Sequence, residues 1–153
     1  MNSRRRPNDA TWLELPEVNV AIFAFLLNFV WEIWQMPLYE ATANSIFFEG
    51  IAGCTLATFG DAAITLIGFW SVAAVVRSRQ WVLRPNWPQV AGFVTVGIVI
   101  TILLETLATG PLDRWNYSDS MPLVPIVHIG LTPFLQWLFL PPLVVWFVRR
   151  QLA

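Results

Sequence analysis

Four long apolar segments dominate this chain of 153 residues and constrain its fold more than any other feature. Each contains the roughly 20 helical residues that are needed to cross about 30 Å of hydrocarbon. Apolar side chains run almost all the way round each segment, which is typical of membrane spans. The sequence therefore predicts an all-α, polytopic integral membrane protein with four transmembrane helices, near residues 17–36, 51–76, 89–109 and 122–148.

Composition agrees with this fold class. Hydrophobic residues make up 56% of the chain and charged residues only 12%, whereas a soluble domain carries about 25% charged residues. We therefore expect a single membrane domain over residues 1–153, with a polar tail at residues 1–15. The chain has no basic stripe of the kind that binds nucleic acid, so a nucleic-acid partner is not expected.

The basic residues predict the orientation of the spans. All nine are arginines, and in a four-span arrangement eight of them fall on one side, while Arg114 falls on the other. The eight are Arg4, Arg5, Arg6, Arg77, Arg79, Arg84, Arg149 and Arg150. By the positive-inside rule, both termini lie in the cytoplasm. The chain is then a multi-pass protein of the cell inner membrane.

A cleaved signal peptide is the alternative interpretation of the first span. The sequence Ala41-Thr42-Ala43 has the small-residue spacing of a cleavage site and follows a basic start. Against cleavage, the preceding segment carries Glu32 and Gln35, which are unusual in the apolar core of a signal peptide. We expect this segment to remain as a span.

Each span carries one stripe of polar side chains at helical spacing. Residues three or four apart share a helix face, so the four stripes can meet in one core. The stripes are Asn28, Glu32 and Gln35; Cys54, Thr58, Asp61 and Thr65; Thr101, Glu105 and Thr109; and His128, Thr132 and Gln136. Threonine, asparagine and cysteine in such stripes usually hold helices together.

The three acids in these stripes fall at one depth. Counted from the arginine-rich end at 1.5 Å per residue, Glu32 and Asp61 are ~22 Å in and Glu105 is ~24 Å in. An acid near the centre of a bilayer costs ~2.5–3.5 kcal/mol or more, so acids seldom serve as packing residues. Their common depth predicts a functional pocket, in which at least one acid is protonated at pH 7.

The pocket residues can be given roles. A protonated Glu105 or Asp61 would donate a proton to an alkene, and Glu32 would accept one. Aromatic side chains would form the walls and stabilise the resulting cation; the candidates are Trp31, Trp34, Trp115, Tyr117 and Trp137. The candidate catalytic residues are Glu32, Asp61, Glu105 and His128. The candidate substrate-binding residues are Asn28, Trp31, Gln35, Trp115, Tyr117, Thr132 and Gln136.

No metal and no cofactor are predicted. Cys54 and His128 are the single cysteine and the single histidine, which excludes an intrachain disulfide, a bis-histidine haem and a Cys/His zinc site. A carboxylate-rich metal site stays open.

The fourth span is predicted to be irregular. Pro133, Pro141 and Pro142 each lack a backbone donor and clash with the carbonyl four residues back. The freed carbonyls then need partners or line a polar cavity.

One stretch resembles a known family. Glu105, Gly110, Trp115-x-Tyr117, Met121-Pro122 and Pro133 are similar to the lycopene cyclase domain, of the heterodimeric type, in small membrane carotenoid enzymes. The resemblance covers residues 100–140. It implies that Glu105 matches the conserved acid of the family, and that Trp115 and Tyr117 match its loop aromatics. The acid pair that the family carries after a proline has no counterpart in residues 131–136.

The leading hypothesis is acid–base chemistry on, or binding of, a hydrophobic isoprenoid or lipid. A similar lipid-accessible arrangement of acids occurs in sterol-isomerase-like proteins, which the chain resembles in architecture alone. Two alternatives stay open: an accessory subunit of a larger membrane complex, and a proton or ion pathway in an oligomer. The expected partners are the lipid bilayer and a hydrophobic ligand, with a homo-oligomer or a membrane-protein partner under the alternatives.

Overall fold

A computed structural model describes residues 12–40 and 47–153. Within these ranges the chain forms four long helices, each long and apolar enough to cross a membrane, which confirms the prediction of an all-α chain with four long apolar helices. They are α1 (Pro16–Gln35), α3 (Phe47–Val76), α4 (Trp87–Thr109) and α5 (Leu131–Leu152). The arginines at positions 4–6 and the candidate cleavage site at 41–43 lie outside the described residues.

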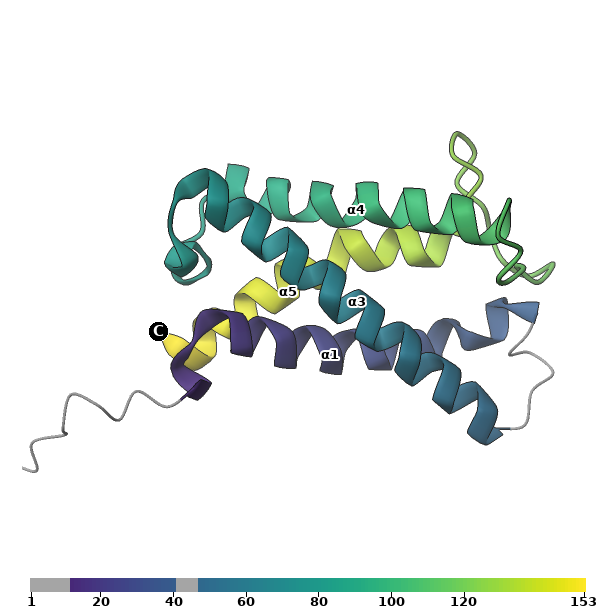
Figure 1. Cartoon of the computed structure of the whole chain (residues 1–153), viewed down its shortest axis with the longest axis horizontal. Helices are drawn as coiled ribbons and strands as arrows, with labels where there is room; N and C mark the ends of the chain where they lie inside the picture. The colour runs from purple at the N-terminus through teal and green to yellow at the C-terminus, as the bar shows by residue number, and fades with distance from the viewer. Residues whose placement is uncertain (1–11, 41–46) are drawn as a thin grey trace, which may run out of the picture.

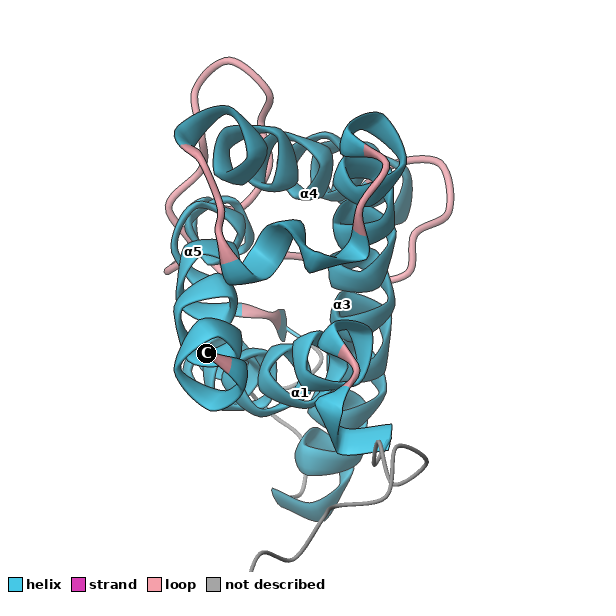
Figure 2. Cartoon of the chain, turned by 90° about the vertical axis from the view of Figure 1, so that its left-hand side faces the viewer, coloured by secondary structure: helices cyan, strands magenta, loops and turns pink. Residues whose placement is uncertain are grey.

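The four helices stand at the corners of a square when viewed along the bundle (Figure 2). Each packs against two neighbours, in the cyclic order α1, α3, α4, α5. The C-terminus and the start of α1 lie at the same end of the bundle (Figure 1). We call this the arginine end, since Arg77, Arg79, Arg84, Arg149 and Arg150 are there. The opposite end, with segments 36–40 and 110–130, is the loop end.

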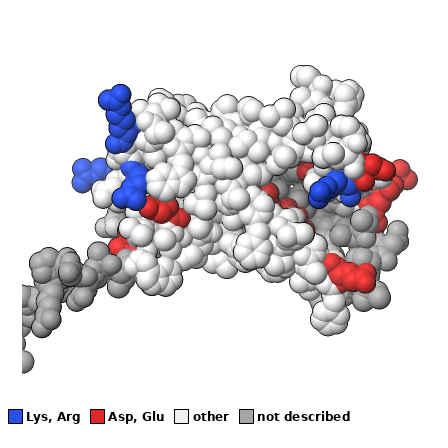
Figure 3. Space-filling view, in the orientation of Figure 1, with Lys and Arg blue, Asp and Glu red and all other residues white. Residues whose placement is uncertain are grey.

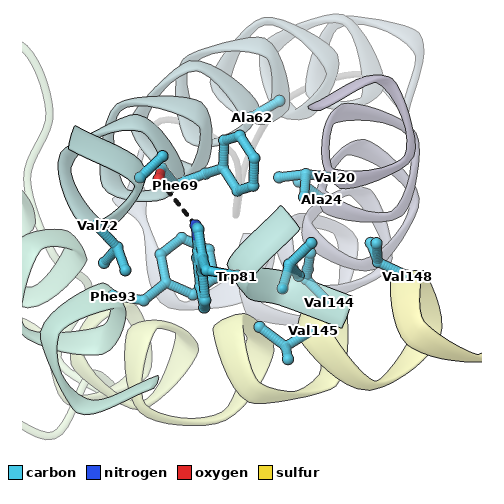
Figure 4. Close-up of a cluster of buried hydrophobic side chains, with 12 residues drawn as sticks. Val20, Ala24, Ala62, Phe69, Val72, Trp81, Phe93, Val144, Val145 and Val148 are labelled. Atoms are coloured by element: carbon cyan, nitrogen blue, oxygen red, sulfur yellow. Dashed lines mark hydrogen bonds between the residues drawn. The ribbon is translucent and has the colours of Figure 1, made fainter. Parts of the chain in front are cut away.

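The half of the bundle near the arginine end is packed with apolar side chains (Figure 4). The short helix η3 (Arg79–Leu83) inserts Trp81 and Val82 between the long helices, and both side chains are buried. The Trp81 indole donates a hydrogen bond to the Phe69 carbonyl at 3.3 Å. This segment lies between the predicted spans at 51–76 and 89–109, and a five-residue helix is too short to give a periodic signal in the sequence.

Local sequence explains where α4 begins. The Asn86 side chain accepts a hydrogen bond from the backbone of Gln89, whose side chain in turn accepts one from the backbone of Asn86. This capping box satisfies two donors that a helix start leaves free. Pro88 occupies the first turn, where no backbone donor is needed.

The fourth span begins nine residues later than predicted, at Leu131 in place of residue 122. Residues 122–131 form a hairpin in which Leu131 donates to the Pro122 carbonyl at 2.7 Å and Val124 to the Ile129 carbonyl at 2.9 Å. His128 lies in this hairpin, exposed, with a φ of 53°. The predicted stripe that placed His128 on a helix face is therefore wrong.

The prolines of the fourth span interrupt it less than expected. The late start of α5 places Pro133 in the first turn, where its missing donor costs nothing. Pro141 and Pro142 lie inside the helix, which continues through them to Leu152. Helix α5 is therefore continuous through the prolines that were predicted to make it irregular.

Candidate functional site

The loop-end half of the bundle contains a cavity of about 510 Å³. All four long helices contribute side chains to its wall, and the loop after α4 adds two. Figure 3 shows this region as a hollow in which Asp and Glu side chains are visible. Glu32 of α1, Asp61 of α3 and Glu105 of α4, the three acids that were expected to share one pocket, all line it.

Glu32 of α1 and Asp61 of α3 form the first part of the site. Their carboxyl groups lie within hydrogen-bonding reach of each other. Two ionised carboxylates have no proton to place between them, so this geometry suits a pair that shares one proton. Gln35 donates a further hydrogen bond to Glu32 Oε1 at 2.7 Å.

Gln136 of α5 connects this pair to the rest of the bundle. Its Nε2 donates to Asp61 Oδ2 at 2.9 Å and to Asn28 Oδ1 at 2.7 Å. Asn28 in turn donates to the Ala24 carbonyl at 2.7 Å. Gln136 and Asn28 are each 2% exposed. One amide therefore joins α1, α3 and α5, and it fixes the direction of the Asp61 carboxyl.

Glu105 of α4 forms the second part of the site. Its Oε2 accepts hydrogen bonds from the Trp115 indole at 3.2 Å and from the Tyr117 hydroxyl. Burial and the facing Glu105 carboxylate raise the pKa of Tyr117, so the phenol stays protonated as a donor. Two donors on one oxygen fix the direction of the carboxyl group and offset part of the cost of burying a charge there. This geometry suits Glu105 to accept a proton or to face a positive charge.

The loop end of the site is closed by pairing of two segments. Tyr39 and Tyr117 form an isolated antiparallel bridge, and their rings lie 5.5 Å apart. Glu40 donates to the Asn116 carbonyl at 3.0 Å on one side of the bridge, and Ser118 donates to the Leu38 carbonyl at 2.9 Å on the other. Burial and Glu105 raise the pKa of Tyr39.

The eleven predicted site residues divide into three groups. Six line the cavity: Glu32, Gln35, Asp61, Glu105, Trp115 and Gln136. Two support these from behind, Asn28 through Gln136 and Tyr117 through Glu105. Three do not contribute to the wall: His128, Trp31 and Thr132.

Those last three residues have other surroundings. His128 is exposed in the hairpin because the helix starts after it. Trp31 turns along its own helix and donates to Gln35 Oε1 at 3.2 Å. Thr132 donates to the Met121 sulfur at 3.4 Å. Thr132 was placed by helical spacing and Trp31 by its aromatic character, and neither property fixes the direction of a side chain.

The threonines of the stripes were expected to hold helices together, but three of them make their hydrogen bond within their own helix. Thr58, Thr65 and Thr109 donate to the carbonyls of Cys54, Asp61 and Glu105, each four residues back in the same helix. A threonine hydroxyl in a helix has this backbone acceptor within reach. The polar contacts between the long helices come from Gln136, from the Glu32–Asp61 pair and from Cys54, whose thiol donates to the Glu32 carbonyl at 3.6 Å.

Several wall residues were not among the predicted site residues. Tyr39 and Arg114 come from the loop end, where a single sequence offers no periodicity to place them. Gly53 and Gly60 form part of the α3 side, whereas Trp137, which was expected among the aromatic walls, forms part of the α5 side. Arg114 is the only cationic side chain in the wall as the described residues define it.

Within residues 12–40 and 47–153, no group of three or more His, Cys, Asp and Glu side chains is arranged to hold a metal ion. Comparison of the chain with protein-family models, with curated proteins and with solved structures gives no match. The function therefore has to be argued from the site itself.

Proposed function

We propose that this protein crosses the cell inner membrane four times, with both termini in the cytoplasm. The length and apolar character of α1, α3, α4 and α5 support the spans. The arginines support the orientation, since those of the described residues gather at one end of the bundle, apart from Arg114. The cavity then lies in the half of the bilayer away from the cytoplasm.

In this setting the cavity binds a hydrophobic isoprenoid or lipid and performs acid–base chemistry on it. One observation carries the proposal: three carboxyl groups from three helices line a single cavity of about 510 Å³. This volume is within the range of small-molecule sites, about 300–1,000 Å³. Three buried acids are expensive for a fold to maintain without a task.

The hydrogen bonds support a different role for each acid. The Glu32–Asp61 pair shares a proton and is the proton donor. Glu105, held by Trp115 and Tyr117, is the acceptor or the counter-charge to a developing cation. The rings of Trp115 and Trp137 in the wall would add cation–π attraction. The sequence analysis had given Glu32 the acceptor role, and the observed donors favour Glu105 for it.

The carotenoid-enzyme resemblance supports an isoprenoid as the ligand. The residues that carry it, Glu105, Trp115 and Tyr117, form one hydrogen-bonded unit at the cavity. An ion pathway is less well supported, because a pathway has to cross the whole bundle. The arginine half of a single chain is filled by the apolar cluster around Phe69 and Trp81.

The test is lipid extraction from purified protein, followed by mass spectrometry of the molecules that remain bound. The wild-type protein should retain a hydrophobic molecule that is enriched over bulk membrane lipids. Asp61→Asn and Glu105→Gln should change the ratio of retained substrate to product, because each removes an ionisable carboxyl. Glu49→Gln is the matched control, since Glu49 is an exposed acid on α3 outside the wall.

Two results would contradict the proposal. One is a wild-type protein with no enriched hydrophobic molecule. The other is an identical profile in all four proteins. Co-purification of a stoichiometric membrane protein in place of a small molecule would point to an accessory subunit.

A further inference from the structure

Helices α3 and α4 pack closely near the arginine end and separate toward the loop end (Figure 1). At Gly68 a Cβ would lie 2.9 Å from the Phe93 ring, so the helices are in contact there. At Gly60 and Gly53, further toward the loop end, a Cβ would have no neighbour within 4 Å. The two helices therefore form a V that is closed at one end and open at the other.

The open part of the V is a side of the cavity. Gly53, Ala57 and Gly60 of α3 line the cavity and are also exposed at the surface of the bundle. Two large apolar side chains also line the cavity and are exposed at the surface, Leu56 of α3 at 75% exposure and Leu104 of α4 at 47%. A residue that is both wall and surface marks a place where the cavity reaches the outside. Figure 3 shows the Asp and Glu side chains through the hollow on this face.

The loop end offers less access than this side. There, the bridge between Tyr39 and Tyr117 and its flanking backbone hydrogen bonds tie segment 36–40 to the loop after α4. Trp115 and Arg114 of the same loop complete that part of the wall. Over the described residues, the route along the bundle axis is covered, while the route between α3 and α4 is open.

We propose that the gap between the loop-end halves of α3 and α4 is a lateral opening, through which the ligand reaches the carboxyl groups directly from the hydrocarbon of the membrane. The inference rests on the proposed function, because it takes the bundle to span the bilayer. It names the ligand class more closely: a molecule dissolved in the membrane, with an elongated apolar body and no formal charge on the part that lies in the opening.

The chemistry of the rim determines this class. Leu56 of α3 and Leu104 of α4 form the rim of the opening, since both line the cavity and are exposed at the surface. In a spanning bundle these side chains face acyl chains, so a molecule that crosses the rim stays in an apolar medium. A charged, water-soluble molecule would lose its hydration on this route without gaining a partner before it reached the acids.

The glycines make the opening testable. A Cβ at Gly60 would have no neighbouring heavy atom within 4 Å, so a leucine side chain at this position begins in open space beside the cavity. Ala63 is the matched control, since it is exposed on the same helix but does not line the cavity. Gly60→Leu should therefore block the opening, and Ala63→Leu should leave it open.

The experiment is photolabelling of the full chain in phosphatidylcholine vesicles with farnesyl benzophenone ether, mapped by peptide mass spectrometry. Labels should concentrate on wall residues such as Ile64 and Trp137 in the wild type and in Ala63→Leu, and most of this labelling should be lost in Gly60→Leu. Benzophenone sulfonate, which is charged and stays in water, should not label these residues. Equal thermal unfolding of the two variants establishes that both are folded.

Three results would overturn the lateral opening. The first is that Gly60→Leu is labelled at the wall as strongly as Ala63→Leu. The second is that the sulfonate labels the wall efficiently. The third is that labelling is spread evenly over the lipid-facing surface. The readout is access of the probe to the wall, and it does not depend on any reaction of the carboxyl groups with a bound molecule. The proposed acid–base function can thus fail while the opening stands, and the two failures are distinguishable.

Discussion

The close approach of α4 to Trp137 provides a quantitative test of the packing that forms the cavity wall. A Cβ at Gly97 would lie 2.0 Å from Cε3 of Trp137, and 2.7 and 2.8 Å from two further ring carbons. Carbon atoms in contact are about 3.5–4.0 Å apart. In Gly97→Ala the new methyl group would therefore lie about 1.5 Å closer to Cε3 than a normal carbon–carbon contact allows. Either the ring or the helix has to move.

Two effects of opposite sign act on this variant. Overpacking of a tight core costs about 1–3 kcal/mol, while alanine is favoured over glycine in a helix by about 0.8–1.0 kcal/mol. Gly92→Ala separates them, because it lies on the same helix and its Cβ would meet only Val72 at an ordinary 3.8 Å. Both variants gain the same helix propensity from alanine, so only the overpacking distinguishes them. Gly97→Ala should therefore be less stable than Gly92→Ala by about 1–3 kcal/mol.

The measurement is unfolding of each variant in detergent micelles, followed by far-ultraviolet circular dichroism. A third protein, Trp137→Leu, removes the indole, and in that background Gly97→Ala should have a much smaller steric cost. Equal stability of Gly97→Ala and Gly92→Ala would refute the reasoning. So would a steric cost that persists without the indole, since the contact with Trp137 would then not be its cause.

Three further predictions follow from the site. Gln136→Leu should destabilise the bundle by about 1–3 kcal/mol, because the buried carboxyl of Asp61 loses a donor; unchanged unfolding in micelles would argue against this hydrogen bond. Tyr117→Phe should weaken the hold on Glu105 and lower retention of the bound molecule, measured by lipid extraction, whereas full retention would show that the phenol does not matter. His128→Ala should match the wild type in both assays, because His128 is exposed outside the wall; a loss of retention would restore its predicted role.

The polar stripes show how far a single sequence reaches into the site. Helical spacing placed Glu32, Asp61 and Glu105 on inward faces at a common depth, and the structure brings all three to one cavity. Spacing alone could not say that Gln136 would connect Asp61 to Asn28, because these residues are 75 and 108 positions away from it. Which helix stands beside which is a property of the packed bundle, and periodicity within one helix carries no information about it.

The errors have physical causes of the same kind. His128 was assigned to a span because apolar composition continues from residue 122 to 148, and composition does not distinguish a hairpin from a helix start. The hairpin forms because Leu131 and Val124 find backbone partners across it. The threonines were assigned to contacts between helices, but the carbonyl one turn back in the same helix is a nearer acceptor.

By itself, the amino-acid sequence determined the four apolar helices and the inward stripes of acids, because both follow from regular spacing along one chain. Only the tertiary structure decided that α3 and α4 part at the loop end and that Trp115 and Tyr117 turn toward Glu105. Those features depend on where side chains of distant segments come into contact. Were Gly60 covered by a neighbouring helix, the acids would be buried packing residues with no route to a ligand.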